Sequence, residues 1–219
     1  MRLPELEALL DHAYLRVLGG FHPGPDDGTP EGCKTLLLLG PDEPRFWPHF
    51  IQTPEYRDDA PNAMDRWSLR VVEECAKRIG AQALFPFGGP PYLPFYSWAL
   101  KTGRAHVSPI RFLVHDRAGL FLSFRGALAL SERIPLPSPE STPCATCAGQ
   151  PCATACPVRA LTPQGYDVAA CKAYIRSDAG RDCRENGCLA RRACPVSKTA
   201  GRLSAQSAYH MQYFIKGSP

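Results

Sequence analysis

The sequence of 219 residues predicts an α+β fold in two domains, residues 1–138 and residues 139–219. Hydrophobic residues make up 44% of the chain, which is enough for a sizeable buried core. Strand-like apolar runs alternate with helix-like periodic runs in the first domain, whereas eight of the ten cysteines lie from residue 144 onward. The proline-rich run "RIPLPSPESTP" at 133–143 separates the two parts and is typical of a linker.

Hydrophobic periodicity and turn residues predict the individual elements. The run "LPELEALLDHAYLRVL" predicts a helix over 3–18 that ends at Gly19-Gly20. A second long helix is predicted over 62–80, with Asn62 as N-cap and Gly80 as terminator. A shorter helix is expected at 93–102 and another at the C-terminus. Strands are predicted at 33–40, 81–87, 109–115 and 120–130, the last two joined by a tight connection through "DRAG".

Charged residues in the first helix-like run indicate the compartment. Glu5, Glu7, Asp11 and Arg16 exclude a signal sequence or a membrane span there, and no later run is long and apolar enough to span. We therefore expect a cytoplasmic protein without a membrane partner. In a reducing compartment, cysteines favour metal binding or redox chemistry over disulfides.

The run "CATCAGQPCATACP" at 144–157 is close to the cysteine pattern of bacterial ferredoxins that bind two 4Fe–4S clusters. In that pattern the cysteine before proline binds the other cluster, and a second Cys-Pro occurs here at Cys194-Pro195. We therefore predict a ferredoxin-like module. Its first cluster takes Cys144, Cys147, Cys152 and Cys194, and its second takes Cys156, Cys171, Cys183 and Cys188.

Zinc is the main alternative for these cysteines, since it also accepts four thiolates at C-x2-C and C-x4-C spacing. The doubled Cys-Pro and the density of the first array favour iron–sulfur clusters. Cys33 opens an apolar strand and Cys75 lies on the apolar face of a helix, so both are expected to be small core residues.

The stretch "HDRAGLFLSFRGALAL" at 115–130 resembles a signature of the cobalamin-processing family, which removes the cyanide or alkyl ligand of cobalamin. The match covers His115, Arg117, Gly119, Arg125 and Gly126. This resemblance implies a nitroreductase-like cobalamin-binding first domain, a central sheet with helices. With the cysteine module added, the chain resembles the superfamily of epoxyqueuosine reductases and reductive dehalogenases. In that superfamily a motif similar to "DVAACKAY" at 167–174 precedes the second array, which supports Cys171 as a ligand.

A corrin ring requires apolar walls and polar groups at its rim. Aromatic residues near 85–98 are suited to such a wall, although they also suit packing of a proline-rich loop on the core. The two arginines are expected to bind corrin amides, a phosphate or a flavin, or else to form ion pairs. His115 is expected to form hydrogen bonds and not to bind cobalt. The candidate corrinoid residues are Phe87, Tyr92, Tyr96, Trp98, His115, Arg117, Gly119 and Arg125. No catalytic residue is assigned.

These observations predict a corrinoid-binding iron–sulfur oxidoreductase. It would receive electrons from a flavodoxin, a ferredoxin or a flavin reductase, with cobalamin as cofactor or as substrate. Two alternatives are an epoxyqueuosine-type tRNA reductase and a non-catalytic electron carrier, and FMN is an alternative cofactor. Residues 141–219 contain ten Lys and Arg against four Asp and Glu, a net charge of +6 that is compatible with tRNA, but no RNA-binding motif is present.

Overall fold

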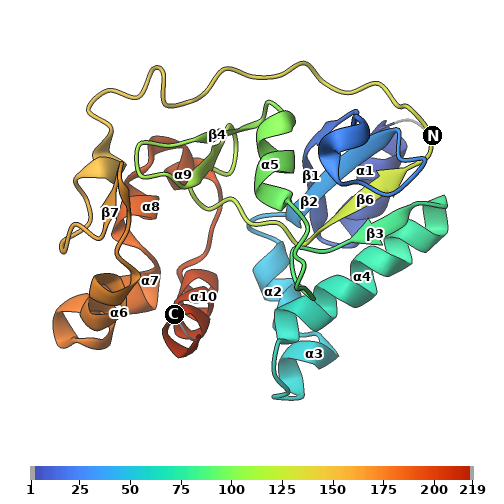
Figure 1. Ribbon diagram of the computed structural model, residues 1–219. Helices are drawn as coiled ribbons and strands as arrows, with labels where there is room; N and C mark the ends of the chain where they lie inside the picture. The colour runs from blue at the N-terminus through green and yellow to red at the C-terminus, as the bar shows by residue number, and fades with distance from the viewer. Residues whose placement is uncertain (1–2, 218–219) are drawn as a thin grey trace. The chain divides into compact units, whose positions relative to one another are not determined.

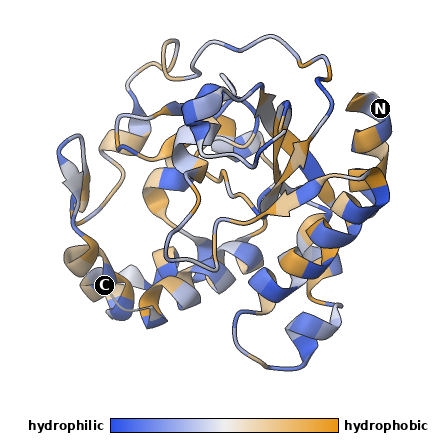
Figure 2. Ribbon diagram, turned by 45° about the vertical axis from the view of Figure 1, so that its right-hand side comes forward, coloured by the Kyte–Doolittle hydropathy of each residue, from blue (hydrophilic) through white to orange (hydrophobic). Residues whose placement is uncertain are grey.

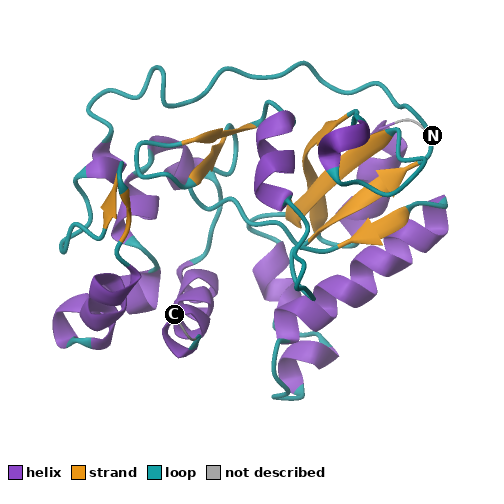
Figure 3. Cartoon of the chain, in the orientation of Figure 1, coloured by secondary structure: helices purple, strands orange, loops and turns teal. Residues whose placement is uncertain are grey.

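The computed structural model describes residues 3–217 and has the predicted α+β composition of helices and small antiparallel sheets (Figure 3). The chain divides into two compact units. Unit 1 consists of Met1–Ala105 with Ser123–Glu140, and unit 2 consists of His106–Leu122 with Ser141–Pro219. The division between Glu140 and Ser141 lies close to the predicted domain boundary after residue 138. The segment His106–Leu122, however, groups with the cysteine-rich part. No helix within residues 3–217 combines the length and the apolar character needed to cross a membrane.

Unit 1 is built on a four-stranded antiparallel sheet with the strand order β1-β2-β6-β3 (Figure 1). The strands are β1 (Leu15–Phe21), β2 (Thr35–Pro41), β3 (Gln82–Leu84) and β6 (Gly126–Leu130). The helices are α1 (Leu3–His12), the 3-10 turn η1 (Pro25–Asp27), α2 (Phe46–Phe50), α3 (Pro54–Arg57), α4 (Ala63–Ile79) and α5 (Phe95–Lys101). Every residue of β2 is buried, as its unbroken apolar run predicts.

The predicted helix over 3–18 is wrong in its second half. Helix α1 ends at His12, and Tyr14 adopts a left-handed conformation with φ 55°. Leu15 to Leu18 then belong to β1, because pairing with the buried strand β2 outweighs their local helical spacing. Gly19 and Gly20 do not terminate a helix. They lie within β1 at an irregularity in its pairing, where a Cβ on Gly20 would come within 2.5 Å of Leu37.

Helix α4 confirms the predicted amphipathic helix over 62–80. Its buried face carries Trp67, Val72 and Cys75, and Figure 2 shows hydrophilic and hydrophobic residues alternating along the helices of this unit. Gly80 terminates α4 with φ 66°, as predicted. Asn62 occupies the N-cap position, but its side chain makes no capping hydrogen bond.

The predicted hairpin of strands 109–115 and 120–130 does not form. Strand β5 (Leu113–His115) pairs with β4 (Ala105–Val107), whereas β6 lies inside the sheet of unit 1 between β2 and β3. The tight turn at "DRAG" is present, since His115 and Gly119 form an antiparallel bridge. The two predicted strands therefore belong to different units.

Unit 2 contains short elements that carry the cysteines. The strands β7 (Leu161–Thr162) and β8 (Gly165–Tyr166) form a small antiparallel pair. The helices are α6 (Val168–Arg176), α7 (Arg181–Asn186), α8 (Leu189–Ala193), α9 (Pro195–Thr199) and α10 (Ser204–Lys216), with 3-10 turns η2 (Pro151–Ala153) and η3 (Asp178–Gly180). Helix α10 is the expected C-terminal helix and packs on α7 (Figure 1). The stretch from 131 to 143 has no helix or strand, as expected for a linker.

Candidate metal centre

Electrostatic contacts divide the eight cysteines of unit 2 into two sets. Burial raises the pKa of the Cys144 thiol, and the neighbouring thiols of Cys194 and Cys147 raise it further. Burial also raises the pKa of Cys152, with further contributions from Cys144, Cys194 and Cys147. These four thiols are therefore mutual neighbours. We call them the Cys144 set: Cys144, Cys147, Cys152 and Cys194.

The remaining four cysteines form the second set. Burial raises the pKa of Cys171, and the thiols of Cys188 and Cys156 add to the increase. Burial likewise raises the pKa of Cys183, to which Cys188 contributes. We call this the Cys156 set: Cys156, Cys171, Cys183 and Cys188. Each set combines cysteines from both arrays, which is the crossed grouping expected from the two Cys-Pro motifs.

All four thiols of the Cys144 set line one cavity of about 380 Å³. Its other walls are largely apolar and come from both segments of unit 2. They include Pro109, Val114, Leu120, Pro143, Pro195 and Val196. Ser108 also lines this cavity, and its hydroxyl is buried without a hydrogen-bond partner within the described residues. Four thiols and one unused donor fit a group that is bound by thiolates and accepts hydrogen bonds at its sulfur atoms.

Within residues 3–217, no three His, Cys, Asp or Glu side chains are grouped closely enough to hold a single metal ion. A 4Fe–4S cluster binds each thiolate at a different iron atom, so its ligands stand further apart than the ligands of one ion. The result therefore concerns single-ion sites. The two sets of cysteines are instead defined by the electrostatic contacts between their thiols and, for the Cys144 set, by a shared cavity.

The first array owes its unusual C-x4-C spacing to a left-handed turn. Gly149 and Gln150 have φ values of 70° and 40°, and the Ala153 N–H then donates to the Gln150 carbonyl at 2.9 Å. This turn leads the chain into η2, which carries Cys152. The two extra residues, relative to the ferredoxin pattern, thus form the entry to the turn that presents a buried thiol.

The second set has a polar neighbour that the sequence did not indicate. Tyr166 lies near Cys171, and its interaction with the thiol lowers the pKa of Cys171 against the effect of burial. Asp167 caps α6, with its side chain accepting from the Ala170 N–H at 2.9 Å, and this places Cys171 in the first turns of the helix. The Ala160 N–H lies 3.3 Å from the Cys156 sulfur, to which it donates.

Two residues of the cobalamin-type signature, His115 and Gly119, shape a turn in unit 2. The N–H and C=O groups of His115 and Gly119 bond to each other at 3.0 and 2.9 Å. His115 is buried, and its Nδ1 accepts from the N–H groups of Arg117 and Ala118 at 3.1 and 3.2 Å. This agrees with the expected hydrogen-bonding role of His115. Arg117 itself is exposed.

The segment His106–Leu122 is fastened to the chain that follows Cys194. The Ser197 hydroxyl accepts from the Leu120 N–H at 2.9 Å, and both groups are buried. Arg191 donates to the Leu120 carbonyl at 3.1 Å, and Arg202 donates to the Phe121 carbonyl at 2.9 Å. This attachment brings the wall residue Leu120 to the cavity of the Cys144 set.

The other candidate corrinoid residues lie in unit 1, where two have internal partners. Trp98 is buried, and its Nε1–H donates to the Asp27 carbonyl at 2.7 Å. Arg125 forms an ion pair with Asp65 at 3.4 Å, as one of the two interpretations predicted. Phe87 is half-buried, whereas Tyr92 and Tyr96 are 67% and 48% exposed and available for contact. The structure thus divides the eight candidates between the units.

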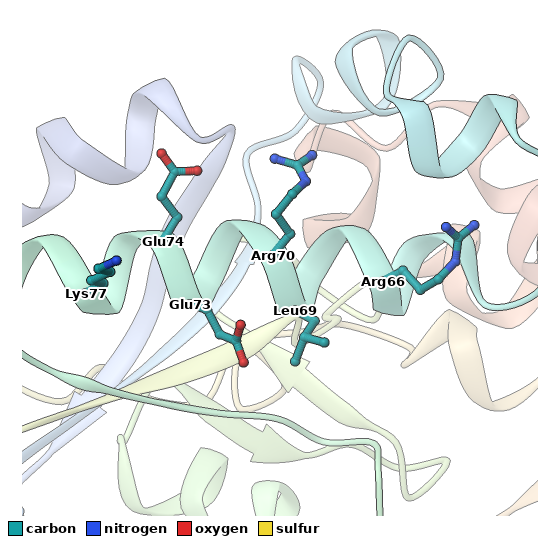
Figure 4. A pocket seen from close by; sticks show the side chains of 6 residues that line it. All are labelled: Arg66, Leu69, Arg70, Glu73, Glu74 and Lys77. Atoms are coloured by element: carbon teal, nitrogen blue, oxygen red, sulfur yellow. The ribbon is translucent and has the colours of Figure 1, made fainter.

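Two further hollows lie in unit 1. One of about 490 Å³ follows the outer face of α4, where Figure 4 shows Arg66, Arg70, Glu73, Glu74 and Lys77 along a single helix. The other, of about 380 Å³, is lined by residues that include His12, His49, Arg70 and Cys75. Both carry charges of mixed sign, and neither contains the four-thiol arrangement of unit 2. Cys75 is buried and Cys33 is partly buried, consistent with structural roles.

No protein-family model, curated protein or solved structure matches this chain.

Sequence spacing indicated the cysteines, but it missed Ser108, Tyr166 and Arg191. These side chains contact the thiols or their cavity only through folding, and no short motif contains them. The net charge of +6 has a structural explanation. Six of the ten basic side chains of residues 141–219 donate to backbone carbonyls within unit 2: Lys172, Arg176, Arg184, Arg191, Arg192 and Arg202.

Proposed function

We propose that this protein is an iron–sulfur electron-transfer protein that holds two 4Fe–4S clusters in unit 2. The observation that carries the proposal is the cavity lined by all four thiols of the Cys144 set. The crossed grouping of the second set supports it. Bound clusters would supply one-electron transfer.

The residues around the Cys144 set bind and shield the group. Val114, Leu120 and Val196 supply apolar walls that limit water near the thiols, and the buried hydroxyl of Ser108, at the wall of the cavity, has a hydrogen bond to offer. In the Cys156 set, Tyr166 is the polar side chain that interacts with Cys171. Burial and hydrogen bonds to sulfur are the protein's means of setting a cluster's potential.

We further propose a corrinoid as electron acceptor, which makes the protein a reductase of cobalamin or a cobalamin-dependent reductase. The support is the resemblance of residues 115–126 to the cobalamin-processing family. His115, Gly119 and Trp98 have internal structural roles, so the exposed aromatic residues Tyr92 and Tyr96 are the proposed contacts with the corrin ring.

The test is anaerobic reconstitution of the full chain, followed by iron and sulfide analysis and absorption spectroscopy. The expected result is about eight iron atoms per chain, corresponding to two 4Fe–4S clusters. Zinc in place of iron, or fewer than two clusters, contradicts the iron–sulfur proposal. Hydroxocobalamin is then added, and an altered cobalamin spectrum supports the corrinoid proposal. Two clusters without any cobalamin binding support the electron-carrier alternative instead.

The tRNA alternative has less structural support. It drew on the basic charge of residues 141–219, and most of those cations are engaged with backbone carbonyls of their own unit. Restoration of queuosine in a deletion strain by this protein would favour the tRNA alternative over the corrinoid proposal.

A further inference from the structure

Arg191 is a cation without a carboxylate partner among the described residues. Its guanidinium donates to the Leu120 carbonyl at 3.1 Å and lies 4.8 Å from the centre of the Phe112 ring. The carbonyl and the ring orient the group but leave its positive charge uncompensated. Arginine stays protonated in proteins, and burying its charge is costly unless an anion lies nearby. Arg191 is partly buried, so its position calls for an anionic neighbour.

The Cys156 set supplies that neighbour. Cys188 directly precedes α8, and the Arg192 N–H donates to the Cys188 carbonyl at 3.0 Å, closing the first turn. Residues three apart on a helix share a face, which places Arg191 on the side of Cys188. Burial lowers the pKa of Arg191, and the Cys188 thiol and Tyr166 act in the opposite direction.

Aromatic contacts extend this arrangement to a second thiol. The Phe112 ring beneath Arg191 packs edge-to-face on Tyr166, with centroids 5.6 Å apart. Tyr166 in turn interacts with the Cys171 thiol. Phe112, Tyr166 and Cys188 all pack against a core cluster of unit 2 that also contains Cys152 and Cys194 of the Cys144 set. Within this packed region, the thiol that interacts with the charge of Arg191 is Cys188 of the Cys156 set.

Other charges near the cysteines are compensated or already engaged. Arg192 lies near Cys183 but is paired with Asp182. Asp167 lies near Cys171 and caps α6. The residues that line the cavity of the Cys144 set are uncharged apart from its thiols. Arg191 therefore creates an electrostatic difference between the two sets.

We propose that Arg191 is the counter-charge of the cluster bound by the Cys156 set and selectively raises its reduction potential. This inference rests on the proposed function. Reduction adds a negative charge to a cluster, so a nearby cation stabilises the reduced form.

The test is a redox titration of the anaerobically reconstituted full chain, followed by electron paramagnetic resonance. Arg191→Gln should reduce the equilibrium constant for reduction of one cluster about tenfold. This corresponds to a potential lower by about 59 mV for one electron, and the potential of the other cluster should stay unchanged. Cys188→Ser identifies the affected cluster, because it perturbs the same transition. Arg191→Lys keeps the charge and should restore most of the potential.

Arg202→Gln is the matched control, since Arg202 also donates to a carbonyl of the segment His106–Leu122 and lies over an aromatic ring, Phe121, at 5.4 Å. This variant should leave unchanged the reduction potential of the cluster bound by the Cys156 set. If Arg191→Gln does not retain both clusters, Arg191→Met preserves the apolar packing on Phe112 and takes its place. Two bound clusters with unchanged potentials in the neutral variant, or a Lys variant as low as Gln, overturn the inference. Failure to bind two clusters in the unmodified protein instead contradicts the proposed function.

Discussion

Gly119 lies directly against Ser197, and a Cβ on Gly119 would come within 2.5 Å of the Ser197 backbone nitrogen. Gly119 also has φ 56°, a conformation that favours glycine. The next residue, Leu120, donates its N–H to the Ser197 hydroxyl at 2.9 Å. This contact joins two segments 77 positions apart in the sequence, and it fixes the wall of the four-thiol cavity.

Gly119→Ala is therefore expected to destabilise unit 2 by about 2–4 kcal/mol, through backbone strain and the clash with Ser197. Anaerobic chemical denaturation of the reconstituted protein measures the change. Gly165→Ala is the control, because no atom lies within 4 Å of a Cβ at that position. Equal stability of the two variants would show that the Gly119 contact is unimportant.

The grouping of the cysteines can be tested with paired substitutions. Cys144→Ser with Cys194→Ser removes two ligands from one set and should leave about four iron atoms in the other cluster. Cys144→Ser with Cys156→Ser removes one ligand from each set and should impair both clusters. Iron and sulfide analysis compares the two proteins. If the first pair impairs both clusters and the second spares one, the crossed grouping is wrong.

Ser108→Ala is expected to lower the reduction potential of the cluster in the Cys144 set, because Ser108 lines that cavity and its buried hydroxyl has no hydrogen-bond partner within the described residues. The expected shift is smaller than that of Arg191→Gln, since a neutral hydrogen bond is weaker than one from a charged donor. The transition that moves should differ from the one moved by Arg191→Gln. Ser177→Ala, which removes an exposed hydroxyl bonded to the Tyr174 carbonyl, serves as the control.

Unit 1 should lose stability in acid through Glu55. The Arg70 guanidinium, 2.5 Å from the Glu55 carboxylate, holds the pKa of Glu55 below its ordinary value of 4.5. A lowered folded-state pKa stabilises the fold above the ordinary pKa, and this contribution is lost as pH falls below about 4.5. Because Arg70 is half exposed, the contribution is less than about 1 kcal/mol.

Thermal unfolding followed by circular dichroism at pH 6 and pH 3.5 measures this effect. Glu55→Gln should reduce the difference between the two pH values. Glu73→Gln, an exposed change on α4, should leave it unchanged. An equal reduction in both variants would assign the acid sensitivity to general surface charge.

The sequence predicted elements whose residues repeat with a clear local period. Strand β2 and helix α4 are examples, because burial on both sides of β2 and on one face of α4 leaves a direct hydrophobic pattern. Strand β1 was mistaken for helix, since its pairing with β2 is a tertiary contact that Leu15 to Leu18 do not reveal by themselves.

The candidate metal centre was predictable to a similar extent. Cysteine spacing and the repeated Cys-Pro indicated the two sets, because ligand geometry constrains spacing within each array. The roles of Ser108 and Arg191 depend on contacts made by the segment His106–Leu122, which lies far from the cysteines in sequence. The same segment carries His115 and Gly119, whose resemblance to a cobalamin signature gave no indication of their packing in unit 2.

The division of the chain into units has a consequence for biosynthesis. During translation, residues 106–122 leave the ribosome before β6, the strand that lies between β2 and β3. The sheet can be completed once residue 130 has emerged, but the earlier segment must wait until Arg191 and Ser197 are made before it can dock. Unit 1 can therefore fold while the protein is still being synthesised, whereas the wall of the four-thiol cavity is among the last parts to form.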